Sequence, residues 1–270
     1  MLHLSQDIWG KIYMNKITKA FENKKAFIAF ITGGDPNIET TEKLIIAMAE
    51  SGVDIIEIGI PFSDPVAEGI VIQEADERAL SNGCTVDKLF DMVKRVRGKV
   101  EIPLLFMSYI NPIFVYGKER FMEKCRECGI DGIIVPDLPY EERKELSAVC
   151  AECGITQISM IAPTSDNRIE NIAKEAEGFI YCVSSLGVTG VRGEIETDVA
   201  EIIKRIKRVS TVPCAVGFGI STPEQARDMA AISDGVIIGS AIVKIVAEHG
   251  SRCVEPVKSF VRKISDAIKR

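Results

Sequence analysis

At residues 54–69 the chain reads DIIEIGIPFSDPVAEG, an apolar run that carries one glutamate and leads into an acidic loop. Side chains two apart on a strand share a face, so the even-numbered isoleucines form one bulky apolar face that helices would cover. Glu57 points the opposite way, with Val53, Ile55 and Gly59. Burying a carboxylate costs several kcal/mol. The run therefore indicates a side chain aimed into a functional cavity; the alternative is a structural ion pair with a base on a neighbouring strand.

Similar β-branched runs recur along the chain and alternate with amphipathic stretches, a spacing typical of repeated βα units. Strands are predicted at 27–32, 54–60, 103–109, 132–136, 156–162, 179–184, 213–217 and 235–239. Helices are predicted at 39–51, 86–97, 118–128, 141–153, 166–176, 196–208 and 223–232. Eight strands alternating with helices predict an α/β fold, a single-domain (β/α)8 TIM barrel over residues 1–270. An extra N-terminal helix at 7–23 would close the bottom of the barrel.

Local signals support these boundaries. Glycines at 52, 129, 154 and 178 fall where helices should stop. Ser221-Thr222-Pro223-Glu224 is interpreted as a capping box, with Ser221 as the cap and Glu224 three residues on. An open doubly wound sheet is the competing architecture, but a dinucleotide fingerprint would usually follow its first strand, and Thr32-Gly33-Gly34-Asp35-Pro36 is not one.

Composition narrows the function classes. The net charge of −6 argues against a general nucleic-acid surface. No apolar run reaches the roughly 18 residues that span a bilayer, and the first residues lack the pattern of a signal peptide, so we expect a cytoplasmic protein without membrane attachment. The eight cysteines are interpreted as reduced thiols.

The predicted strand ends concentrate polar and small residues, and in such barrels chemistry lies at these ends. The late ends are rich in glycine: Gly187-Val188-Thr189-Gly190, Gly217-Phe218-Gly219 and Gly239-Ser240. With Ser240 opening a helix, exposed backbone N–H groups predict a phosphate site. No predicted strand carries lysine, and His3 and His249 are the only histidines, which argues against a Schiff base and against a histidine-bound metal. Proton transfer by carboxylates therefore remains as the expected chemistry.

The chain resembles the α subunit of tryptophan synthase over nearly its whole length. The resemblance rests on the stretch at 54–69, on the glycine-rich strand ends, and on the segments Phe30-Ile31-Thr32-Gly33-Gly34-Asp35-Pro36 and Gly239-Ser240-Ala241-Ile242-Val243. The resemblance implies a lyase without cofactor that splits indole-3-glycerol phosphate into indole and glyceraldehyde 3-phosphate. By the family pattern Glu57 protonates carbon 3 of the indole, and a second acid holds the ring N–H. That position is Glu68 here, where the family normally has aspartate, and Ile70 stands where proline is common.

The resemblance also assigns the remaining site residues. Phe30, Tyr109, Tyr181 and Phe218 would line the indole pocket. Gly190, Gly219, Gly239 and Ser240 would hold the phosphate, and Thr189 would bond to the second acid and help close the loop. The family's partner is a β subunit that contains pyridoxal phosphate, in an α2β2 tetramer. The implied docking residues are Asp64, Pro65, Asn111, Pro112, Asp137 and Pro139.

Two points stay open at the level of sequence. Besides the lyase subunit, a free-standing lyase that releases indole and a catalytically silent activator of the β subunit remain alternatives, the latter because of Glu68 and Ile70. Cys125, Cys128, Cys150 and Cys153 form two Cys-x-x-Cys pairs with a spacing like that of four-cysteine zinc sites. They are interpreted as small apolar residues packing inward at helix ends, with no metal.

Overall fold

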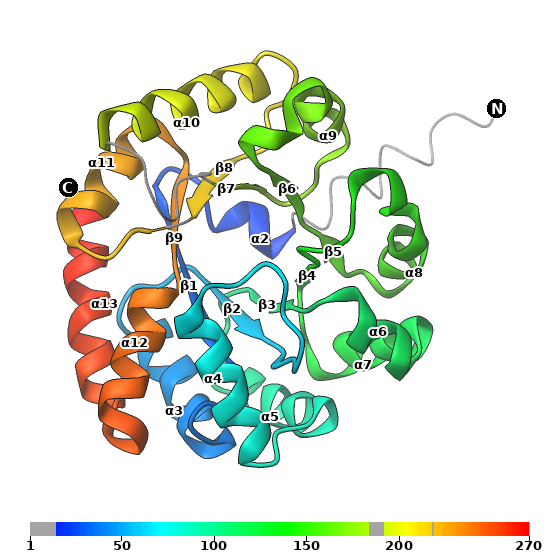
Figure 1. Cartoon of the computed structure of the whole chain (residues 1–270), viewed down its shortest axis with the longest axis vertical. Helices are drawn as coiled ribbons and strands as arrows, with labels where there is room; N and C mark the ends of the chain where they lie inside the picture. Colours follow the sequence, from blue (N-terminus) through cyan, green and yellow to red (C-terminus); the bar gives the residue numbers. More distant parts are fainter. Residues whose placement is uncertain (1–14, 184–191, 218, 270) are drawn as a thin grey trace.

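The computed structural model describes residues 15–183, 192–217 and 219–269, and in them nine parallel strands form one sheet ringed by helices (Figure 1). The strand order is β5-β4-β3-β2-β1-β9-β8-β7-β6. The bounds are β1 Ala26–Thr32, β2 Ile55–Gly59, β3 Leu104–Met107, β4 Gly132–Ile134, β5 Thr156–Gln157, β6 Ser159–Ile161, β7 Ile180–Val183, β8 Cys214–Gly217 and β9 Gly235–Ile238. The predicted (β/α)8 barrel is confirmed.

The ninth strand arises because the predicted strand 156–162 is interrupted at Ile158. β5 pairs with β4, whereas β6 pairs with β7, so the two short strands are the ends of the sheet order and join through this break. The N–H of Ile158 still donates to the carbonyl of Ile133, at 2.9 Å, and its side chain packs in the barrel interior. The prediction of one continuous strand was wrong because this segment changes pairing partner halfway.

Twelve α-helices lie in the described part of the chain. They are α2 Lys16–Lys19, α3 Ile38–Ala49, α4 Ile70–Ser81, α5 Val86–Arg97, α6 Ile110–Tyr116, α7 Lys118–Cys128, α8 Lys144–Cys153, α9 Ile169–Glu175, α10 Arg192–Lys207, α11 Pro223–Ile232, α12 Ser240–His249 and α13 Val254–Ile268. The bounds of α5, α7 and α11 are as predicted. Three helices, α4, α6 and α13, had no predicted counterpart. Each begins without a side-chain cap, but so does α7, which was predicted, so the missing cap alone does not explain the three.

The capping box before α11 lies one residue further along than predicted. The cap is Thr222, whose hydroxyl accepts from the N–H of Gln225, and the Gln225 side chain accepts from the N–H of Thr222 in return. Pro223 explains the shift: proline is favoured at the first helical position, so the preceding residue becomes the cap. The assignment to Ser221 and Glu224 was therefore wrong.

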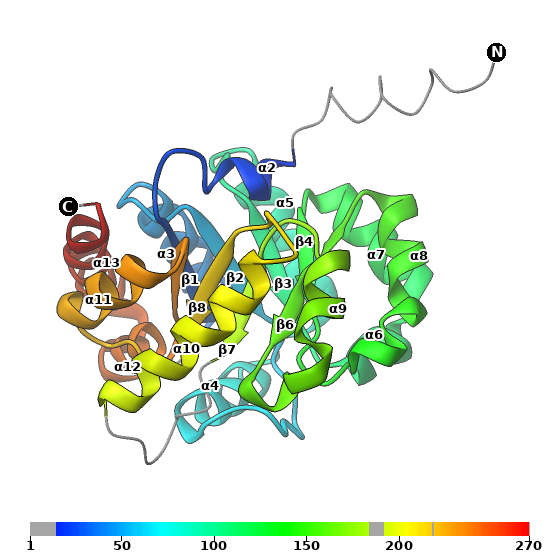
Figure 2. The ribbon, with the colours of Figure 1, turned by 90° about the horizontal axis from the view of Figure 1, so that it is seen from above.

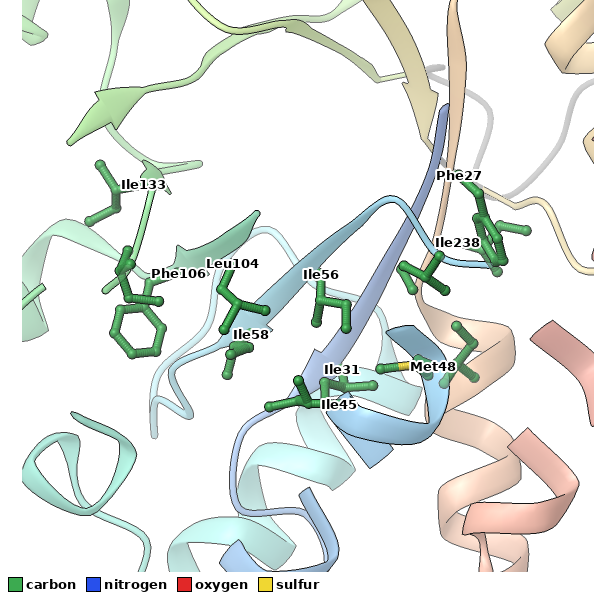
Figure 3. Close-up of a cluster of buried hydrophobic side chains, with 14 of the residues drawn as sticks. Phe27, Ile31, Ile45, Met48, Ile56, Ile58, Leu104, Phe106, Ile133 and Ile238 are labelled. Carbon is green, nitrogen blue, oxygen red and sulfur yellow. The ribbon is translucent and has the colours of Figure 1, made fainter. Parts of the chain in front are cut away.

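Side chains of the strands divide into an inner and an outer core, as the alternation in β2 predicts. Ile55 packs inside the barrel with Leu105 and Ile237, while Ile56 and Ile58 face the helices (Figure 3). Val53 precedes β2 and packs with the outer core, so the alternation starts only at Ile55. Each fully buried large side chain contributes about 1.5–3 kcal/mol, and the two cores thus hold the strand ends in place.

The N-terminal segment closes one end of the barrel. Of the predicted helix 7–23, residues 7–14 lie outside the described residues, and the rest contains the short α2, at the opposite end from α4 (Figure 2). Asn15 caps α2 and donates to the Thr156 hydroxyl at 2.7 Å. Ile17 is fully buried against the strand starts, where a methyl group on Gly132 would come within 3.0 Å of it. Solvent is thereby excluded from this end.

All eight cysteines have free thiols and are buried. The two Cys-x-x-Cys pairs end α7 and α8, just before Gly129 and Gly154 in the left-handed conformation, and their side chains belong to the outer core. Among the described residues, no group of three or more His, Cys, Asp or Glu side chains is arranged to hold a metal ion. In the same residues, no helix has the length and apolar character needed to cross a membrane.

Candidate active site

The inner face of β2 carries Glu57 in the centre of the barrel. It is paired in register with Phe30 on β1 and Leu105 on β3, and it is fully buried. Neither carboxyl oxygen has a hydrogen-bond partner, and no salt bridge to it exists among the described residues, which speaks against a structural ion pair. Burial raises the pKa of Glu57 to about 8. The carboxyl group is therefore mostly protonated at neutral pH and is available as an acid.

Two aromatic side chains lie beside this acid because glycines make room for them. A methyl group on Gly59 would meet the Phe30 ring at 2.7 Å, and one on Gly217 would meet the Tyr181 hydroxyl at 2.6 Å. Burial, with a smaller contribution from the nearby Glu57 carboxylate, raises the pKa of Tyr181 well above its usual value. The glycines at these strand ends thus serve close packing of aromatic rings over the barrel centre.

A cavity of about 860 Å³ opens at the carboxyl ends of the strands, within the range of ligand pockets. Its lining brings together six of the predicted catalytic and substrate-binding residues, Phe30, Glu68, Tyr181, Gly219, Gly239 and Ser240, and two of the predicted docking residues, Asp137 and Pro139. Ile72 and Met107 add apolar surface. Glu57 does not itself line the cavity but is paired in register with Phe30, which does.

One side of the cavity can receive an anion. Gly239 and Ser240 lie at the N-terminus of α12, and no side chain caps that end, so its first backbone N–H groups are free for a ligand. Gly219 also lines the cavity, in a left-handed conformation with a φ of 70°, and a Cβ atom added to it would meet no atom within 4 Å. Three further predicted residues, Thr189, Gly190 and Phe218, lie outside the described residues.

Tyr109 anchors the acidic loop rather than the cavity wall. Its hydroxyl accepts from the N–H of Ala67 at 2.9 Å, and its ring centre lies 5.4 Å from that of Phe62. At the end of the loop the side chain of Gln73 donates to the carbonyl of Glu68 at 2.8 Å. These contacts hold the Glu68 carboxyl at the cavity, with its Oε2 atom buried and without a hydrogen-bond partner.

The structure adds one acid that sequence reasoning missed. Asp76 on α4 is only 4% exposed and accepts from the N–H of Phe62 at 3.4 Å. Its carboxyl group lies within hydrogen-bonding reach of that of Glu68. Asp76 falls on the buried stripe of α4, at helical spacing from Ile72 and Ala79. The sequence signal that could have identified Asp76 is an acid among apolar residues at helical spacing. That signal can be recognised only if residues 70–81 are first predicted to be a helix.

The rim around the acidic loop exposes large apolar side chains. Val66 is 82% exposed, Ile70 71%, Phe114 48% and Val115 81%. The predicted docking residues lie on the same rim: Asp64, Asn111 and Pro139 are exposed, and Pro65, Pro112 and Asp137 are half-buried. Asp137 also accepts from the N–H of Ile110 at 2.9 Å and so fixes the start of α6. Exposed apolar groups with a polar rim are typical of a protein interface.

A (β/α)8 barrel with a buried acid and a ligand-sized cavity at the carboxyl ends of its strands has the arrangement of a barrel enzyme, whose active site lies at those ends. The model of the family described as tryptophan synthase alpha chain matches residues 17–269. The chain belongs to this family. It is accordingly a lyase of tryptophan biosynthesis that cleaves indole-3-glycerol phosphate.

Individual relatives agree with this assignment. The tryptophan synthase alpha chain of Lacticaseibacillus casei is 46% identical over 255 residues, which cover 94% of this chain and 96% of that protein. The crystal structure of tryptophan synthase subunit alpha from Legionella pneumophila superposes with a TM-score of 0.86 at 36% identity, covering 95% and 99% of the two chains. A structure of the tryptophan synthase α2β2 complex from Pyrococcus furiosus gives 0.83 at 38% identity, covering 89% and 98%.

Proposed function

We propose that the cavity binds indole-3-glycerol phosphate with its indole ring against Phe30, Ile72 and Tyr181 and its phosphate at the start of α12. The apolar lining suits the ring, and the free N–H groups at Gly239 and Ser240 suit the phosphate. Thr189, Gly190 and Phe218 complete this proposal on the strength of the family motif alone. The observation that carries it is the buried, unpaired Glu57 beside Phe30.

Glu57 acts in this proposal as the general acid and then the general base. Indole is a poor leaving group as a carbanion, so carbon 3 first receives the proton of Glu57 and becomes tetrahedral. The carboxylate formed then accepts the proton of the side-chain hydroxyl as the carbon–carbon bond breaks. The bonding electrons return to the ring, which yields indole and glyceraldehyde 3-phosphate with no net change in protons. The raised pKa of Glu57 keeps the acid protonated at neutral pH.

Glu68 holds the ring N–H as the second acid. Protonation of carbon 3 places positive charge on the ring nitrogen, and a carboxylate at that nitrogen stabilises the charge. The unpaired Oε2 atom of Glu68, on the loop that Tyr109 anchors, supports this role. No cofactor is needed for either proton transfer.

The exposed rim around the acidic loop is proposed to dock the β subunit of an α2β2 complex, as in the relative from Pyrococcus furiosus. The docking residues would be Asp64, Pro65, Asn111, Pro112, Asp137 and Pro139, around the exposed Val66 and Val115. Indole would pass to that partner, which carries the pyridoxal phosphate, and the reaction would take place in the cytoplasm. Because the loop touches both the substrate site and the rim, docking can change the rate of cleavage.

The test is the rate of indole release from indole-3-glycerol phosphate by the purified chain, alone and with the β subunit from the same source. We expect a slow rate alone and a strongly raised rate with the partner. Fast release by the lone chain would favour a free-standing lyase. No release in either case, with the β reaction still stimulated, would make the chain a silent activator and would contradict the proposal.

A further inference from the structure

Asp76 is a buried acid for which the cleavage reaction, as described so far, has no use. It lies on the inward stripe of α4 with Ile72, Ala75 and Ala79, and its side chain is 4% exposed. α4 packs on β1 and α12, and the α12 residue that meets this stripe is the apolar Val243. A carboxyl group in such surroundings needs a partner or a proton.

The contacts of Asp76 link both ends of the acidic loop. At the start of the loop, the N–H of Phe62 donates to Oδ2 of Asp76 at 3.4 Å. At the end of the loop, the carboxyl group of Glu68 lies within hydrogen-bonding reach of the Asp76 carboxyl and of the Tyr109 hydroxyl. Two carboxylates can only accept, so a hydrogen bond between these two groups requires that they share one proton.

The charged groups around this pair supply no cation to replace that proton. Arg78, the nearest base on α4, forms a two-pronged ion pair with Asp35 at 2.9 and 2.8 Å. Asp35 itself adds negative charge, as does the thiol of Cys84 when it ionises. No salt bridge to Glu68 or Asp76 is found among the described residues. Burial, and then the charge of Glu68, raise the pKa of Asp76 to about 8.

We propose that Asp76 is a positioning residue that shares one proton with Glu68 and thereby fixes the second acid of the cleavage reaction at the substrate. The proposal rests on the proposed role of Glu68. Protonated Asp76 donates to the Glu68 carboxylate and accepts from Phe62 N–H. It thereby fixes how far the Glu68 side chain, with its two methylenes, extends toward the substrate. Oε2 of Glu68 is then free to accept the N–H of the indole ring.

Loss of the shared proton reverses this arrangement. Above about pH 8 both carboxyl groups are ionised and repel each other, and Glu68 moves away from its bonding position. A displacement of about one ångström costs on the order of 10²-fold in rate. Cleavage thus depends on the protonation of Asp76 although Asp76 does not touch the substrate.

The experiment compares Asp76→Asn, Asp76→Ala and the control Glu77→Ala, which removes an exposed acid next to Asp76 on α4. The amide of Asn can still donate to Glu68 and accept from Phe62, so Asp76→Asn should keep kcat within about threefold at pH 7. Asp76→Ala should lower kcat by roughly 10- to 100-fold, on the scale of a misplaced group. Above pH 8 the Asp76→Asn variant should lose activity less steeply than the wild type, because one titrating group is gone.

A second readout does not depend on turnover: limited proteolysis of the loop 62–68, which should be faster in Asp76→Ala and unchanged in Glu77→Ala. Wild-type kcat in Asp76→Ala, or equal losses in the Asn and Ala variants, would overturn the proposal while leaving the function of the chain intact. If the wild type itself releases no indole, the proposed function fails, and loop proteolysis alone then tests the contact between Asp76 and the loop.

Discussion

Glu57→Gln is expected to lower kcat for indole-3-glycerol phosphate cleavage by about 10²–10⁴-fold, the contribution of a general acid. Gln has nearly the same shape but cannot act as an acid, and the side chain is fully buried outside the cavity lining. Binding of a non-cleavable analogue that keeps the ring and phosphate should therefore stay within a few-fold of wild type. Steady-state kinetics and calorimetric titration measure the two effects separately. Retained turnover in this variant would contradict the role of Glu57 as the general acid.

The same substitution should stabilise the protein, which distinguishes it from general damage. The pKa of Glu57 is raised to about 8 in the folded protein from 4.5, so the wild type loses stability relative to the Gln variant as pH rises between these values. At pH 7 the Gln variant should be more stable by on the order of 2–3 kcal/mol, and near pH 4 the difference should vanish. Urea unfolding at both pH values measures it. A less stable Gln variant at pH 7 would contradict the burial argument.

Glu68→Ala is expected to lower kcat by about 10²–10³-fold, the usual cost of removing one preorganised group at a developing charge. Glu68→Gln should lose less, because its amide oxygen still accepts the ring N–H but carries no charge. Glu74→Gln, an exposed acid on α4, is the matched control and should behave as wild type. The kinetics should show the loss in kcat more than in KM, since the ring nitrogen is charged only during the reaction. Equal kcat in Glu68→Ala and wild type would remove Glu68 from the mechanism.

The barrel could be predicted because its signals are local. Alternation in 54–60 separates Glu57 from Ile56 and Ile58, and glycine stops such as Gly129 and Gly154 end helices where the sequence indicates. The break at Ile158 escaped prediction because it depends on pairing: it follows from a change of neighbour strand.

The candidate site was predicted where a motif meets a strand end. Phe30, Tyr181, Gly239 and Ser240 come together around one cavity for that reason. Tyr109 shows what sequence cannot supply: it was predicted to line the indole pocket, but its hydroxyl contacts the backbone of Ala67 and it is not part of the cavity lining. Asp76 depends on tertiary contact in the same way, since it meets Glu68 across a loop and a helix start.

The most direct measurement of the central claim, that a buried protonated Glu57 starts the cleavage, is the pH dependence of kcat/KM for indole-3-glycerol phosphate. It should be recorded for the wild type and for Asp76→Asn. Glu57 and Asp76 both have a pKa of about 8, and the variant removes the titration of Asp76 from the profile. In both proteins kcat/KM should fall as pH rises through about 8. The fall should be about tenfold per pH unit in Asp76→Asn and steeper in the wild type. If kcat/KM in Asp76→Asn instead falls already through pH 4–5, or is flat to pH 10, Glu57 is not the proton donor.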